Sequence, residues 1–177
     1  MEMDLFWSIV INVLIAIAIF YLLIVIVDVS FVLSFRSIMK NHDHDISIIL
    51  TNKKDNLVKL IPLLNEHGVK VDKKKADELT LFDLSRINNQ NSKEAKKARE
   101  ELTLLGDYFL SLCYENDKVN DTNDFLLIDN NLKDIERVYR QHVLMYNADV
   151  LGYNYWISFF LTRYIYLILR IKKKDII

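Results

Sequence analysis

Apolar positions form one long uninterrupted run near the start of the chain. Residues 5–27 carry no charged side chain, and the run ends at Asp28. At 1.5 Å per residue, a helix over this run is about 35 Å long, which exceeds the roughly 30 Å hydrocarbon core of a bilayer. The run is longer than the apolar part of a cleaved signal peptide, and no Ala-x-Ala cleavage site follows it. The pattern predicts an uncleaved N-terminal transmembrane anchor over residues 1–35.

Basic residues lie on one side of this predicted span. No Lys or Arg precedes it, whereas Arg36 and Lys40 follow it closely. Lys and Arg next to a span favour the cytoplasmic side of the membrane. We therefore expect a single-pass protein of the cell membrane, with its N-terminus outside and its C-terminal domain in the cytoplasm. The lipid bilayer is its first expected partner.

After a polar juxtamembrane linker, expected over residues 36–45, apolar positions recur at helical spacing. Pro62 falls inside the first of these patterns, where it either kinks the helix or starts a new one. Residues 68–75 break the period and are expected to form a loop. Ser92 is the expected N-cap of a further helix that runs to about Cys113.

The last predicted helix is the longest, and either Asp121 or Thr122 is expected to cap it. Its apolar positions alternate steps of three and four, apart from two successive steps of four at residues 135, 139 and 143, a pattern typical of helices packed at a shallow angle, as in a coiled coil. These seam positions are Phe125, Ile128, Leu132, Ile135, Tyr139, Val143, Tyr146, Val150, Tyr153, Ile157, Phe160, Tyr164 and Leu167. About 45 residues of helix would be close to 70 Å long. The predicted fold is all-α, with an N-terminal transmembrane helix followed by an elongated antiparallel three- or four-helix bundle over residues 46–177.

Residues 151–169 are apolar enough to form a second span, because their only charge is Arg163. Two points oppose a span. Arg163 in the hydrocarbon would cost about 2.5–3.5 kcal/mol, and Lys172, Lys173 and Lys174 would lie outside, against the positive-inside bias. We expect this end to lie along a helix seam or on a membrane surface, with the three lysines near anionic lipid headgroups.

The last helix contains the repeated pair Tyr146-Asn147 and Tyr153-Asn154, and its spacing resembles that of the LemA family. The matching positions are Phe125, Ile128, Leu132, Glu136, Tyr146, Asn147, Val150, Tyr153, Asn154, Ile157 and Phe160. Pro62 also lies in a Leu-Ile-Pro motif similar to one of this family. Leu161 stands where the family has Pro, so the helix is expected to run on. The resemblance implies a membrane-anchored helical bundle in a family with no established enzymatic activity.

The amino-acid composition excludes several classes of binding site. The three glycines are isolated, which excludes a Gly-rich phosphate loop, and the single Cys113 excludes an internal disulfide framework or a multi-Cys zinc site. A net charge of −1 gives no general attraction to nucleic acid. We therefore expect no enzyme activity, no cofactor, no nucleic acid and no small-molecule substrate. Cys113, at the end of an apolar stripe, is interpreted as a buried small hydrophobe.

Few residues suggest a reactive or metal-binding site. His42 and His44 are two residues apart, whereas ligands on a helix favour spacings of three or four, so we interpret them as part of a solvated linker rather than as metal ligands. Glu136 could act as a general acid, but no His or second carboxylate recurs beside it at helical spacing. We expect it to form an ion pair with Arg140, one turn further on.

The sequence leaves two functions open. The first is a non-catalytic scaffold or adaptor that self-associates or binds another membrane protein, with the aromatic stripe from Tyr146 to Tyr164 as the contact surface. The second is a membrane-remodelling or pore-forming protein in which residues 151–169 insert. Asn147 and Asn154 either bond to neighbouring helices and fix their register, which we favour, or meet a partner.

Overall fold

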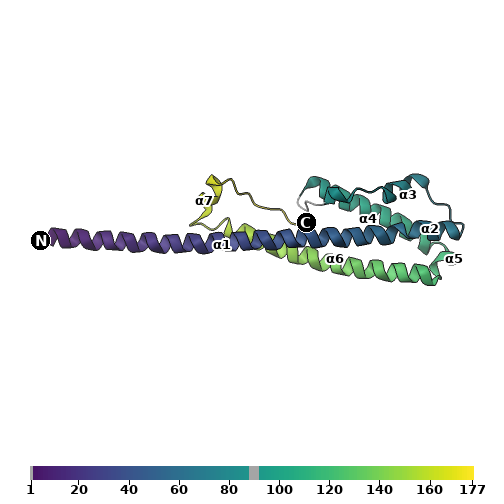
Figure 1. Ribbon diagram of the computed structural model, residues 1–177, viewed down its shortest axis with the longest axis horizontal. Helices are drawn as coiled ribbons and strands as arrows, with labels where there is room; N and C mark the ends of the chain where they lie inside the picture. The colour runs from purple at the N-terminus through teal and green to yellow at the C-terminus, as the bar shows by residue number, and fades with distance from the viewer. Residues whose placement is uncertain (1, 88–91) are drawn as a thin grey trace. The chain divides into compact units, whose positions relative to one another are not determined.

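The computed structural model describes residues 2–87 and 92–177, and every regular element in these ranges is a helix (Figure 1). This confirms the all-α class. Two compact units make up the chain. Unit 1 comprises Met1–Ile38 and Asp149–Lys174, and unit 2 comprises Met39–Ala148 and Asp175–Ile177. In this division, residues 149–174 group with residues 1–38 rather than with the rest of the helical part.

Helix α1 spans Glu2–Val58, so the expected linker at residues 36–45 is helical. Within it, His42 is buried between buried Met39 and Ile46, at the spacing of one helix face. The helical pattern therefore continues through the polar run. In the described part of the chain, α1 is the one helix long and apolar enough to cross a membrane.

In unit 2, Pro62 lies at the third position of α2 (Leu60–Glu66), directly after the turn that ends α1. A backbone N–H at this position has no partner inside the helix, so Pro is tolerated there. Lys59, between the two helices, keeps helical backbone angles (φ −65°, ψ −20°), so α2 follows α1 after an interruption of one residue. Gly68 has a φ of 73° and ends α2 in the left-handed region that Gly adopts without strain. The expected loop over residues 68–75 is shorter than predicted, because Asp72 caps α3 (Lys73–Thr80) through the backbone N–H of Lys74.

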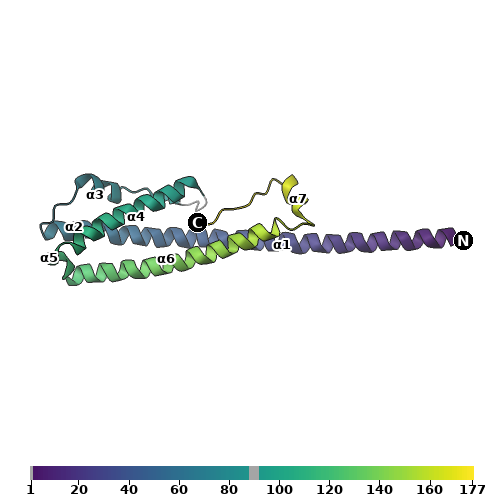
Figure 2. The same ribbon diagram turned by 180° about the vertical axis from the view of Figure 1, so that it is seen from behind.

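Helix α4 (Lys93–Tyr114) packs against four other elements of unit 2: α2, α3, η1 (Leu84–Ile87) and α5 (Asp117–Asn120) (Figure 2). The Oγ of Ser92 accepts a hydrogen bond from the N–H of Ala95 at 2.9 Å, which confirms the predicted cap. The buried positions of α4 are Ala95, Ala98, Leu102, Gly106, Phe109 and Cys113. Their spacing of three and four forms one continuous stripe, which is the centre of the unit's core.

Helix α6 (Asn123–Trp156) begins after Thr122, whose Oγ1 accepts from the N–H of Phe125 at 3.2 Å. Two expectations are corrected: α1, with 57 residues, is the longest of the described helices, and α6 ends at Trp156 instead of running on past Phe160. The chain turns over residues 157–162 and re-forms one short helix, α7 (Arg163–Ile168).

The end of α6 changes which seam positions are buried. Phe125, Leu132, Tyr146, Val150, Tyr153 and Ile157 are buried as predicted, whereas Phe160, Tyr164 and Leu167 are exposed. Thr162 and Tyr166 are buried in their place. Tertiary contacts of these two residues therefore override the helical period of the sequence.

Two leucines of α4 test the core of unit 2. Leu102 is fully buried and Leu104 is 69% exposed. We expect Leu102→Ala to lower the free energy of unfolding by about 2–5 kcal/mol, because it leaves a cavity. Leu104→Ala, the matched control, should change it by less than about 0.5 kcal/mol. Denaturant unfolding of the full chain in detergent, followed by circular dichroism, measures both, and equal losses would contradict the assigned core.

Candidate functional site

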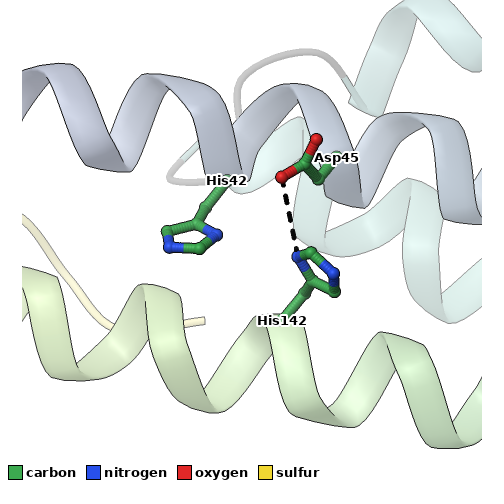
Figure 3. Close-up of side chains that lie close together, drawn as sticks. All are labelled: His42, Asp45 and His142. Carbon is green, nitrogen blue, oxygen red and sulfur yellow. Dashed lines mark ion pairs between the residues drawn. The ribbon is translucent and has the colours of Figure 1, made fainter.

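Two histidines and one carboxylate of unit 2 converge from two helices (Figure 3). His42 and Asp45 lie three residues apart on α1, so their side chains project from neighbouring positions of one face. His142 lies on α6 and points back toward them. Its Nδ1 is 3.8 Å from Oδ2 of Asp45, and one ligand-type atom from each of the three residues lies within 4.8 Å of the others.

This histidine–aspartate cluster is only partly shielded from water. His42 is 9% exposed, and the side chains of His142 and Asp45 are 26% and 44% exposed. The Nδ1 atom of His142 is itself buried and makes no hydrogen bond within the described residues, since 3.8 Å to Asp45 is too long for one. Two imidazoles and a carboxylate are a donor set that divalent transition metals accept.

The cluster corrects the sequence-based interpretation of the polar run. His42 was expected in a solvated linker but is buried, whereas His44 is exposed and takes no part in the cluster. The three-residue spacing of His42 and Asp45 was available in the sequence as a signal. No comparable signal pointed to His142, which approaches them only because α6 lies beside this part of α1.

A second polar group of unit 2 surrounds Glu136. Its Oε1 accepts from Nε of Arg140 at 3.3 Å, which confirms the expected pair, and its Oε2 accepts from Nζ of Lys53 at 3.1 Å. Burial acts to raise the pKa of Glu136, but the charge and hydrogen bond of Lys53, together with Arg140, outweigh it and lower that pKa. Glu136 is thus held ionised in a bond between α6 and α1, as a structural acceptor.

Near the junction of α4 and α6, Asp129 is buried and accepts the hydroxyl of Tyr114 and the ammonium of Lys133, both at 2.6 Å. Cys113 beside it is fully buried. Burial, and secondarily the charge of Asp129, raises the pKa of Cys113 to about 11. The thiol is therefore neutral near pH 7 and behaves as the small buried hydrophobe that the sequence predicted.

In unit 1 the chain after α6 packs on α1. The hydroxyl of Tyr166 donates to Oδ2 of Asp28 at 2.8 Å, and Asp28 is only 1% exposed. Trp156 stacks on Phe31 with 4.6 Å between ring centroids and 4° between ring planes. These contacts place Trp156 and Tyr166 against the part of α1 that follows its apolar run.

Gly152 brings the last turns of α6 close to α1 in unit 1. A Cβ at this position would lie 2.6 Å from Cζ of Phe35, which is closer than carbon atoms approach without displacement. The absence of a side chain therefore allows the two helices to meet at this ring.

The two motif asparagines bind main chain rather than neighbouring helices. In unit 1, Asn154 donates from Nδ2 to the carbonyl of Lys174 at 2.7 Å and accepts from its N–H at 2.9 Å. In unit 2, Asn147 makes the same two bonds with Ile177, both at 2.9 Å. The side chains of Lys172 and Lys173 are left exposed.

The expected contact surface from Tyr146 to Tyr164 is mostly inside the protein. Tyr146 and Tyr153 are buried, and the Tyr153 hydroxyl donates to the main-chain carbonyl of Lys172 at 3.4 Å. Only Phe160 and Tyr164 of this stripe present their rings to the outside. The tyrosine repeat thus supports packing, and Phe160 and Tyr164 are the rings of this stripe that a partner could reach.

Removal of the Tyr166 hydroxyl tests the contact with Asp28. The second oxygen of Asp28, Oδ1, is buried and makes no hydrogen bond within the described residues. Tyr166→Phe would deprive this buried carboxyl group of its donor, at a cost of about 1–3 kcal/mol.

Hydrogen exchange of the amides in α7 measures this cost. We expect exchange about 5- to 100-fold faster in Tyr166→Phe, since 1.4 kcal/mol corresponds to about tenfold. Tyr164→Phe, a control on an exposed ring, should exchange like the unaltered chain. Equal protection in both variants would show that the hydroxyl contributes nothing.

No protein-family model matches this chain, and comparison with curated proteins and with solved structures finds no match either. What the chain does is therefore inferred from its own residues and contacts.

Proposed function

We propose that the chain is a single-pass membrane protein whose helical part is a non-catalytic scaffold or adaptor; the membrane-anchored helical bundle is also what the resemblance to the LemA family implies. The proposal of a transmembrane anchor rests on the surface of α1 over residues 5–27. Nearly all its side chains are apolar, and nearly all are exposed in unit 1. A continuous apolar surface of this size is unfavourable in water, whereas a helix that satisfies its own backbone suits lipid.

Basic residues support the proposed orientation. Arg36 follows the apolar run on α1, and Arg163, Arg170 and Lys172 belong to the same unit. Because basic residues near a span favour the cytoplasmic side, the N-terminus is placed outside and unit 2 in the cytoplasm.

The segment after α6 is proposed to lie in the cytoplasmic interface of the membrane. It packs on α1 close to the end of the apolar run, where Tyr21 donates to the carbonyl of Leu161 at 3.0 Å. Its outward side chains are those of Phe160, Tyr164, Leu167, Ile168 and Leu169. Aromatic and aliphatic groups of this kind fit the boundary between headgroups and acyl chains, and Lys172, Lys173 and Lys174 lie close enough in sequence to meet anionic headgroups.

The alternative function, pore formation or membrane remodelling, requires residues 151–169 to cross the bilayer. Such a span needs about 20 residues of continuous helix. Here α6 ends at Trp156, and α7 contains 6 residues. A segment broken in this way suits the interface better than the hydrocarbon, so the scaffold is the preferred proposal.

In unit 2, α1 and α6 pair in opposite directions, because Asp45 meets His142 and Lys53 meets Glu136. This supports the proposed antiparallel bundle. Exposed apolar side chains on α6 offer a surface for a second copy or for another membrane protein. Leu127, Val138 and Met145 are exposed and, at spacings of 11 and 7 residues, share one helix face.

Mass measurement tests the scaffold. Light scattering of the full chain in detergent, corrected for bound detergent, should give a defined multimer. Met145→Glu should shift the mass toward a single chain while helix content stays unchanged, because a charge would enter the contact. Leu104→Glu, at a position that is also exposed but lies on α4, serves as the control and should leave the mass unaltered. A single-chain mass for the unaltered protein would contradict self-association.

A further inference from the structure

We propose that His42, Asp45 and His142 bind one divalent transition-metal ion, which joins α1 to α6 in unit 2. This goes beyond the proposed scaffold function, which requires no cofactor. The three groups are two imidazole nitrogens and one carboxylate oxygen, a set found in zinc and non-haem iron sites. Three protein ligands leave a further coordination position for water.

The helices supply the geometry of this site. His42 and Asp45 are three residues apart on α1, which brings two ligands to one face of one helix. His142 approaches from α6 and completes the set (Figure 3). Each ligand thus comes from a regular element, so the positions of the Cα atoms are fixed by helix packing rather than by a loop.

Distances between the ligand atoms are close to those that a metal requires. Ligands bound at about 2.0–2.1 Å to a tetrahedral ion lie about 3.3 Å apart. Oδ2 of Asp45 and Nδ1 of His142 are 3.8 Å apart, and all three ligand atoms lie within 4.8 Å of one another. Rotation of side chains closes this gap, since Asp45 and His142 are only partly buried and have room to move.

A simple ion pair accounts for the arrangement less well. The 3.8 Å between Oδ2 of Asp45 and Nδ1 of His142 is too long for a hydrogen bond. Nδ1 of His142 is buried and makes no other hydrogen bond within the described residues. A buried ring nitrogen that lacks a partner costs free energy. A metal ion between the two groups satisfies that nitrogen and the carboxylate together, and it lies where His42 also reaches.

Metal binding would have a mechanical consequence for unit 2. His42 and Asp45 lie on the part of α1 that follows the apolar run, and His142 lies about two turns from Glu136 on α6. An ion would add a second link between the helices, in addition to the bond of Lys53 to Glu136. Because the folded chain would bind the ion and the unfolded chain would not, the ion would raise thermal stability.

Titration of the full chain with Zn²⁺ tests the site. The protein is purified in detergent without a polyhistidine tag, treated with a chelator and titrated by calorimetry. Co²⁺ serves as a second probe, because its visible absorption reports the number and type of ligands. We expect one ion per chain, Co²⁺ bands typical of nitrogen and oxygen ligands, and a higher unfolding temperature with Zn²⁺.

Two variants test one proposed ligand on each helix, and a third is the control. His142→Ala and Asp45→Asn should each weaken Zn²⁺ binding by at least tenfold, with Asp45→Asn retaining the shape of the side chain if His142→Ala fails to fold. His44→Ala is the matched control, because His44 is exposed and outside the cluster. Absence of stoichiometric binding, or an equal loss in His44→Ala, would overturn the proposal, and circular dichroism verifies that each variant is folded.

Discussion

The apolar surface of α1 over residues 5–27 has to leave water, and the arrangement of unit 1 depends on this requirement. A large apolar side chain gains about 1.5–3 kcal/mol when it is fully removed from water, and the run contains many of them. Within the described residues, the other segment of unit 1 meets this run near its end, where Tyr21 donates to the carbonyl of Leu161, and nearly all side chains of the run stay exposed. In the proposed anchor, lipid would cover them without any further folding, because a helix already satisfies its own backbone groups.

Asp28 is the first charged residue after the apolar surface that has to leave water. Its carboxyl group is buried by protein and bonded to Tyr166, while Trp156 covers Phe31 nearby. The residues after α6 therefore serve unit 1 by covering the polar end of the apolar run. This explains why α6 does not continue, since a straight helix would carry Tyr166 away from Asp28.

In unit 2, polar contacts between α1 and α6 align the two helices. Glu136 and Lys53 hold α6 to α1 through a charged hydrogen bond, and the histidine–aspartate cluster lies on the same pair of helices. Such contacts specify how two helices are aligned, because an unpaired buried charge is costly. The apolar stripe of α4, centred on Leu102 and Phe109, supplies the burial that stabilises the unit.

Local features could be predicted from sequence because each depends on residues that are close along the chain. The apolar run, the Ser92 cap, one of the two alternatives for the α6 cap and the pair of Glu136 with Arg140 belong to this class. The end of α6 could not be predicted, because the helical period continues past Trp156 and the break depends on contacts of distant residues. For the same reason the sequence did not reveal that His142 meets Asp45.

Accessibility of single cysteines tests the membrane anchor most directly. In a Cys113→Ser background, one chain carries Cys at Val13, inside the apolar run, and another at Asn52, an exposed position in unit 2. A membrane-impermeant maleimide added to intact cells should label neither. After the cells are opened, Asn52→Cys should react at once, and Val13→Cys only once the membrane is dissolved and the chain unfolded. Rapid labelling of Val13→Cys in intact membranes, or of Asn52→Cys from outside, would contradict the account.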